Sequence, residues 1–315
     1  MTIAQIENAQ IENAQIENNE IRLRHLWLEI TKKCNLRCEH CYVGAGSHLP
    51  LLEDMTIRQW VKVINEGYEE GCRSIQFIGG EPILHPDLDI LLRTARTLGY
   101  EAIEVYTNGT CHPSKWLDLF VELRVNVAFS FYATKPEIHD EITGVQGSYQ
   151  LTLKGIDLAL AAGLRVRVGI IQISQTDEEI ELTLELLKLR GVTNVGFDRM
   201  RHIGRADNDG AYTPPLKQLG ELCGQCSNGK LVVTTTGQTY PCIMARAWPL
   251  GSIENGLKSV IHSQQLAIFR KNQLDLMVAK GNMVIKNCPS DPPKCKPSNP
   301  PPPGCKPYCK PSDDW

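Results

Sequence analysis

The segment HLWLEITKKCNLRCEHC, residues 25–41, carries the most information in the chain, because a strand-like run leads directly into three cysteines. Cys34, Cys38 and Cys41 have the spacing C-x3-C-x2-C. Three thiolates this close in sequence can hold three irons of a cubane and leave the fourth iron without a protein ligand. An open iron is what a chelating substrate needs, as at the open position of a catalytic metal site.

A structural zinc site is the alternative interpretation of the same cysteines. Zinc would require a fourth cysteine or histidine nearby. His40 is badly placed because it is adjacent to Cys41, whereas His48 could reach. The spacing favours the cluster over zinc.

Strands and helices alternate about six times between residues 25 and 200, which predicts an α/β fold with parallel strands and right-handed crossovers. Strands are expected at residues 25–31, 74–78, 101–107, 126–132, 165–173 and 194–200. Helices are expected at residues 56–68, 88–99, 114–123, 149–162 and 176–189. A barrel and a doubly wound sheet both fit, and both place ligands at the carboxyl ends of the strands.

Local signals predict where some elements begin or turn. Thr56 is a plausible helix N-cap, and Thr176 with Glu179 is expected to form a capping box. A hairpin with its turn near Gly237 and a helix over residues 257–272 are expected further on.

Composition limits the class of protein. The 315 residues are enough for one large α/β domain plus a smaller module. A formal net charge of -3 argues against a nucleic-acid or anionic-membrane binder driven by bulk electrostatics. No run of 18 apolar residues and no signal-peptide pattern are present, so we expect a cytoplasmic protein without nucleic-acid or membrane partners.

The twelve cysteines are unevenly distributed. Three lie at residues 34–41, Cys72 and Cys111 are isolated, and seven lie between residues 223 and 309. In a reducing compartment clustered cysteines favour metal ligands over disulfides. The distribution therefore predicts two metal-binding regions.

Gly79-Gly80-Glu81-Pro82 follows the second expected strand. Glycines let a backbone approach a ligand closely, and a carboxylate suits an ammonium group. A turn before a helix is the alternative interpretation of this motif taken alone.

C-x3-C-x2-C followed by Gly-Gly-Glu-Pro resembles the radical S-adenosylmethionine (SAM) superfamily over about residues 26–206. The resemblance implies a partial (β/α)6 TIM-like barrel and a 4Fe-4S cluster on Cys34, Cys38 and Cys41. The fourth iron would be chelated by SAM, and reductive cleavage would yield a 5′-deoxyadenosyl radical that abstracts hydrogen from a substrate. His40 departs from the aromatic residue that the family usually has before the third cysteine.

The same resemblance suggests residues that contact SAM. The glycine-rich motif would bind the SAM amino group, and the remaining candidates follow later strands. These cofactor-binding candidates are Gly79, Gly80, Glu81, Pro82, Asn108, Ser130, Gln172 and Arg199. Each later candidate could equally be a turn residue, a strand residue or a surface ion-pair partner.

Cys111 lies just past the third strand. A thiol there could donate a hydrogen atom to a substrate radical, as epimerases of the superfamily require. A packed loop cysteine is the alternative.

Cys226, Gly237 and Cys242, separated by ten and four residues, resemble the opening of the SPASM module, which binds auxiliary iron-sulfur clusters. Cys223 lies close by, and a hairpin with cysteines at both ends brings thiolates together. The later cysteines depart from the SPASM spacing; they are Cys288, Cys295, Cys305 and Cys309. We expect one auxiliary cluster on Cys223, Cys226, Cys242 and one tail cysteine, with a second cluster, a zinc site or a disordered tail left open.

Three regions are expected: an N-terminal IENAQ-repeat arm at 1–24, a barrel at 25–206 and a SPASM-like region with a Pro/Cys-rich tail at 207–315. The resemblance implies an oxidoreductase that modifies a ribosomally made precursor peptide by crosslinking, epimerisation or oxidation. Flavodoxin or ferredoxin would supply electrons. A radical dehydrogenase for a small biosynthetic intermediate and a non-catalytic zinc adaptor are the alternatives.

Overall fold

The computed structural model covers most of the chain between Arg22 and Ala279. It describes residues 22–51, 55–112, 114–207, 219–220, 222–224, 226 and 228–279. The IENAQ repeat and the four tail cysteines at 288, 295, 305 and 309 lie outside the described residues.

The described residues form a nine-stranded sheet with the order β6-β5-β4-β3-β2-β1-β7-β8-β9. Strands β1 to β6 pair in parallel, and so do β1 and β7, whereas the β7–β8 and β8–β9 pairs are antiparallel. The strands are β1 (His25–Thr31), β2 (Ser74–Gly79), β3 (Ala102–Thr107), β4 (Asn126–Ser130), β5 (Val166–Gln172), β6 (Asn194–Arg199), β7 (Lys230–Val233), β8 (Gln238–Tyr240) and β9 (Gly251–Ser252). Within this part of the chain the sheet curves without closing, so the expected α/β partial barrel is confirmed.

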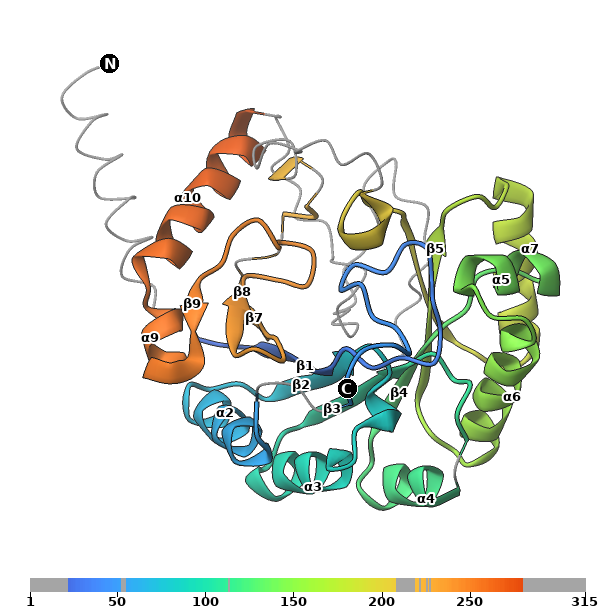
Figure 1. The fold of residues 1–315 in the computed structure, drawn as a ribbon, viewed down its shortest axis with the longest axis horizontal. Helices are drawn as coiled ribbons and strands as arrows, with labels where there is room; N and C mark the ends of the chain where they lie inside the picture. The colour runs from blue at the N-terminus through green and yellow to red at the C-terminus, as the bar shows by residue number, and fades with distance from the viewer. Residues whose placement is uncertain are drawn as a thin grey trace, which may run out of the picture.

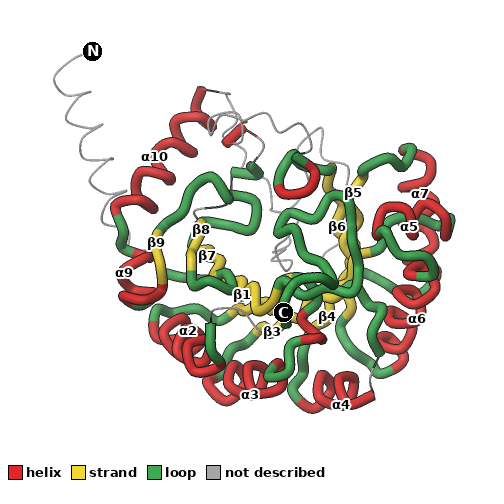
Figure 2. The backbone as a smooth tube through the Cα atoms, viewed as in Figure 1, coloured by secondary structure: helices red, strands yellow, loops and turns green. Residues whose placement is uncertain are grey.

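Helices cover the outside of this curved sheet, and loops gather on its inner side (Figures 1 and 2). The outer helices are α2 (Ile57–Glu69), α3 (Leu88–Leu98), α4 (Ser114–Glu122), α5 (Pro136–Thr143), α6 (Ser148–Ala161) and α7 (Asp177–Leu189). The helix expected over residues 257–272 is two helices, α9 (Leu257–Ile261) and α10 (Gln264–Ala279), because the chain turns at His262. None of the helices in the described ranges combines the length and apolar character that a bilayer crossing needs.

Strand β1 is buried along its whole length. Alternate side chains of a strand face opposite sides. Leu26 and Leu28 accordingly join the main core under the outer helices, whereas Trp27 joins a second apolar cluster that contains Phe269 of α10. The expected hairpin is present as β7 and β8, and β7 pairs in parallel with β1. The hairpin that lies between Cys226 and Cys242 is therefore attached directly to the barrel sheet.

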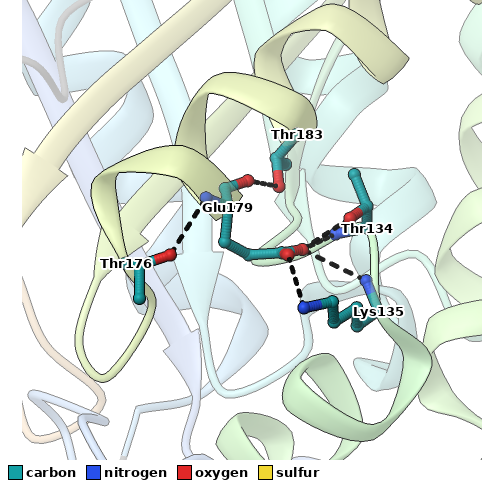
Figure 3. Close-up of polar contacts among 5 residues, drawn as sticks. All are labelled: Thr134, Lys135, Thr176, Glu179 and Thr183. Carbon is teal, nitrogen blue, oxygen red and sulfur yellow. Dashed lines mark hydrogen bonds and ion pairs between the residues drawn. The ribbon is translucent and has the colours of Figure 1, made fainter.

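Glu179 joins the two loops that follow β4 and β5 (Figure 3). Its backbone N–H donates to the hydroxyl of Thr176 (3.2 Å), which is half of the expected capping box. Its buried carboxylate accepts from the backbone N–H (2.7 Å) and hydroxyl (2.6 Å) of Thr134, and lies 3.7 Å from Nζ of Lys135. The return bond of the capping box was wrongly predicted, because these donors from another loop take the carboxylate. A reciprocal box forms instead at the start of α2, between Thr56 and Gln59.

We expect Glu179→Gln to lower the free energy of unfolding at pH 7 by about 1–3 kcal/mol, since hydrogen bonds to a charged carboxylate are weakened. Burial raises the pKa of Glu179, but the hydrogen bonds from Thr134 and Lys135 together lower it by more than burial raises it. The pKa therefore lies below its ordinary value. The difference between wild type and variant should be fully present above the ordinary glutamate pKa of about 4.3 and should shrink as the pH falls below it.

Urea unfolding at pH 7 and at about pH 3 measures this difference. Glu178→Gln is the matched control, because Glu178 is exposed in the same helical turn and loses the same charge. Equal losses of stability in the two variants at pH 7 would contradict the role of the Glu179 carboxylate.

Candidate active site

Cys34, Cys38 and Cys41 lie on the loop after β1 and line a single cavity of about 220 Å³. The cavity lies at the carboxyl ends of the parallel strands, and residues at or near the ends of β2 to β6 contribute to its wall. No three His, Cys, Asp or Glu side chains in the described ranges converge on a point that could hold a single metal ion. A cubane differs, because each cysteine binds a different iron and the thiols need only face a common space.

Hydrogen bonds reach two of these sulfurs. The backbone N–H of Leu36 donates to Cys34 Sγ (3.4 Å), and that of Ala45 donates to Cys41 Sγ (3.3 Å). Burial raises the pKa of the Cys34 and Cys38 thiols to about 12, so the free thiols are protonated at neutral pH. A bound metal deprotonates a coordinating thiol, and N–H donors to sulfur then stabilise the thiolate.

Gly79 and Gly80 bring the end of β2 against the start of the cysteine loop. A Cβ atom on Gly79 would lie 2.2 Å from the carbonyl oxygen of Thr31, and one on Gly80 would lie 2.3 Å from that of Lys33. The backbone N–H of Gly80 donates to Thr31 (2.6 Å), and that of Glu81 donates to Lys33 (2.8 Å). Only residues without a side chain fit here, and their backbone lines the cavity.

Glu81 and Pro82 are not among the residues that line this cavity. The buried Glu81 carboxylate accepts from the hydroxyl of Thr107 (2.8 Å) and the backbone N–H groups of Asn108 (2.7 Å) and Ile83 (3.1 Å). Burial raises its pKa to about 7, although these bonds oppose the rise. The geometry therefore places the glycine backbone, rather than the Glu81 carboxylate, at the cavity wall.

Three other predicted SAM contacts line the cavity, namely Asn108, Ser130 and Arg199. Asn108 Nδ2 also donates to Asn35 of the cysteine loop (2.8 Å) and lies 3.7 Å from Cys34 Sγ. Gln172 does not line the cavity, because its side-chain amide donates to the Gln175 carbonyl (3.1 Å) and to Asp177 (2.8 Å).

Cys111 lines a separate cavity of about 30 Å³ against Trp116 and Phe120 of α4. It packs against the main core rather than facing the cysteine loop. This position does not support hydrogen-atom donation into the main cavity, and the packed loop cysteine fits instead.

His40 has the tyrosine ring of Tyr132 as its neighbour, with the hydroxyl 3.1 Å from Nε2. Its Nδ1 is buried and has no hydrogen-bond partner among the described residues. Burial lowers the pKa of His40 to about 4, so the ring is neutral at pH 7.

A buried polar group that was not predicted contributes Arg167 and Gln76 to the wall of the same cavity. Arg167 of β5 pairs with Glu104 of β3 (2.6 Å), and the Gln76 side-chain amide of β2 donates to the same carboxylate. Arg167 reaches Glu104 past Ala128, its small partner on β4. The sequence did contain a signal for this group, because Glu104 and Arg167 are charged residues inside otherwise apolar strands.

The second set of cysteines also comes together. Cys226 and Cys242 are buried with their sulfurs 2.9 Å apart, and Cys223 lies within hydrogen-bonding reach of Cys226. Burial opposes ionisation of Cys242, but hydrogen bonds from Cys226 and two backbone N–H groups lower its pKa overall. Cys226 and Cys242 belong to the second apolar cluster, and Cys223 packs against it.

The fold and site define an open parallel α/β barrel whose first loop presents three cysteines to a cavity. A family model described as the radical SAM superfamily matches residues 28–187, slightly more than half of the chain. The protein therefore belongs to the radical SAM superfamily. Members use a 4Fe-4S cluster and SAM, so these expected cofactors are confirmed.

The antilisterial bacteriocin subtilosin biosynthesis protein AlbA of Bacillus subtilis is 27% identical over 183 residues, which span 58% of this chain and 40% of AlbA. A probable GTP 3′,8-cyclase of Methanopyrus kandleri is 24% identical over 282 residues, 77% of this chain and 90% of the cyclase. The crystal structure of Streptococcus suis SuiB has a TM-score of 0.65 at 14% identity, covering 84% of this chain and 72% of SuiB. At that identity the likeness to SuiB shows the fold.

We expect Gly80→Ala to weaken iron binding roughly tenfold or more, because the new methyl group would displace the cysteine loop at Lys33. Gly163→Ala is the control, since a Cβ there meets nothing within 4 Å and costs only a left-handed backbone conformation. Iron per chain after anaerobic reconstitution at a series of iron concentrations measures the effect. Equal iron binding by the two variants would refute the close-approach argument.

Proposed function

We propose that the protein is a radical SAM enzyme that modifies a ribosomally made precursor peptide. The observation that carries the proposal is the single cavity shared by Cys34, Cys38, Cys41 and the Gly79–Gly80 backbone. AlbA is a protein of bacteriocin biosynthesis, and SuiB has a structure bound to its precursor peptide SuiA. The match spans only 40% of AlbA, so a peptide substrate for this protein is a proposal based on the likeness.

The residues at the cavity fit the cluster and SAM. Three thiols face one space, two have N–H donors, and His40 Nδ1 lacks a partner among the described residues. When bound, the cluster and SAM supply one-electron cleavage to a 5′-deoxyadenosyl radical, with electrons from a donor such as flavodoxin or ferredoxin. The backbone of Gly79 and Gly80 would position SAM, and Asn108, Ser130 and Arg199 would contact it.

Apolar side chains complete the wall of this cavity; they include Ile78, Ile170, Ile171, Ile243 and Met244. Exclusion of water protects a reactive intermediate from side reactions. In this proposal these side chains shield the reacting atoms from water. Which peptide hydrogen lies nearest the radical would decide whether the product is crosslinked, epimerised or oxidised.

Cys223, Cys226 and Cys242 would hold an auxiliary cluster together with one tail cysteine. Cys226 and Cys242 are buried at the two ends of the hairpin attached to β1, and Cys223 lies beside Cys226. The tail candidates lie outside the described residues.

A radical enzyme for a small molecule is the second candidate function. The relationship to a probable GTP 3′,8-cyclase favours it, as do the polar cavity residues Gln76 and Arg167, which both bond to the buried Glu104. Such a polar group suits a small polar substrate. Membership of the superfamily gives no support to a non-catalytic zinc adaptor.

We expect wild-type protein, reconstituted anaerobically and given SAM and dithionite, to form 5′-deoxyadenosine. The variant in which Cys34, Cys38 and Cys41 are all alanine should form none, because the open iron would be lost. A wild-type protein that holds zinc and leaves SAM intact would disprove the radical function. A short peptide encoded beside the gene and changed in this assay, either in mass or in the chirality of a residue, would favour the first function. A peptide unchanged in both would favour the small-molecule function.

Cys242→Ala should lower the iron content by about four per chain while SAM cleavage by the first cluster persists. Cys111→Ala is the matched control, because it removes a thiol that contacts neither cysteine site. Iron and sulfide analysis with a 5′-deoxyadenosine assay checks both variants. Unchanged iron in Cys242→Ala would mean that this site binds no cluster.

A further inference from the structure

Arg205 follows β6 and holds three carbonyl groups of the cysteine loop. Its backbone N–H donates to Cys41 (3.0 Å), its Nε to Cys38 (2.9 Å) and its Nη2 to Ala45 (2.8 Å). These contacts join segments about 160 residues apart and span the part of the loop that carries the second and third cysteines.

The residue before it makes an independent contact with the same loop. Gly204 has φ +67, and a Cβ atom on it would lie 2.5 Å from the carbonyl oxygens of both Cys41 and Tyr42. The backbone of this segment therefore lies directly on the loop, with no space for a side chain between them.

The first half of the loop has a different anchor. The backbone N–H of Arg37 donates to Thr143 (2.9 Å) and that of Glu39 donates to Ile142 (3.2 Å), both at the end of α5. In the second half, Ala45 packs in a small apolar cluster with Leu36, and the His40 ring lies within hydrogen-bond distance of the Tyr132 hydroxyl. The segment after β6 adds the contacts that bind the backbone carbonyl groups of this half.

Arg205 also places a positive charge next to Cys38, one of the expected cluster ligands. Its guanidinium is hydrogen-bonded to the carbonyl of Cys38 itself. Net charge near an iron-sulfur cluster is one of the factors that set its reduction potential, and a nearby cation favours the more negative, reduced state. Arginine suits this position because its planar fork can reach two carbonyls at once.

We propose that Arg205 is a positioning residue that holds the Cys38–Ala45 half of the cysteine loop and raises the reduction potential of the cluster there. The proposal rests on Cys34, Cys38 and Cys41 being the ligands. It concerns how the chain tunes that site, whatever the substrate.

The test compares Arg205→Met, which removes the charge and both side-chain bonds, with Arg205→Lys, which keeps the charge but not the fork. Arg190→Met is the matched control, because it removes one positive charge from a surface pair with Asp157 (2.6 Å). Full-length proteins are reconstituted anaerobically, and the EPR signal that changes on addition of SAM is followed. This signal reports the SAM-binding cluster separately from auxiliary iron.

Both Arg205 variants should release this cluster to an iron chelator roughly tenfold or more faster than wild type. Arg205→Met alone should shift the reduction potential to more negative values, and Arg190→Met should change neither quantity. The proposal would be overturned if Arg205→Met released the cluster at the wild-type rate and had the wild-type reduction potential. Equal shifts of the reduction potential in Arg205→Met and Arg205→Lys would also overturn it.

The metal-free proteins are compared by thermal unfolding. Similar melting temperatures for Arg205→Met and wild type are expected, and failure of the metal-free variant to fold would overturn a role confined to the loop. A separate experiment tests whether Cys34, Cys38 and Cys41 bind the cluster. If they do not, the variant with all three replaced by alanine will retain the SAM-responsive EPR signal.

Discussion

The close approach of the Gly79–Gly80 backbone to the carbonyl groups after β1 is the contact on which the site depends. The space between them cannot hold even a methyl group. Two parallel strands thus end at one point, and the chain leaves β1 as a loop whose three thiols turn toward the cavity. Glu81 strengthens this junction by linking the end of β2 to the backbone after β3.

The cysteine loop has little regular structure of its own and takes its shape from its neighbours. The end of α5 holds its first half, and the segment after β6 holds its second half. These two anchors follow β4 and β6 in the chain, and neither of these strands is next to β1 in the sheet. A loop anchored in this way can keep three thiols apart and facing one space, as a cubane requires.

The two cysteine sites share one sheet. Because β7 pairs with β1, the hairpin that leads to Cys242 is an extension of the barrel. Arg246, four residues later, pairs with the buried Glu29 of β1, and its guanidinium carbon lies 5.3 Å from the centre of the Tyr42 ring, next to Cys41. A buried carboxylate needs such a partner, so the pair ties the second site to the strand that carries the first.

Sequence periodicity and spacing alone determined the alternating strands and helices, the β7–β8 turn at Gly237 and the grouping of the cysteines, because these depend on near neighbours in the chain. The family motif also indicated a glycine backbone at the cavity. Only the tertiary structure decided that Glu81 turns away from the cavity, that Cys111 packs under α4 and that Gln172 bonds to its own loop. The same holds for Arg167 and Arg205, whose partners lie about 60 and 160 residues away. Hydrogen-bond donors compete for each buried carboxylate and carbonyl, and which donor wins depends on distances that exist only once the strands are side by side.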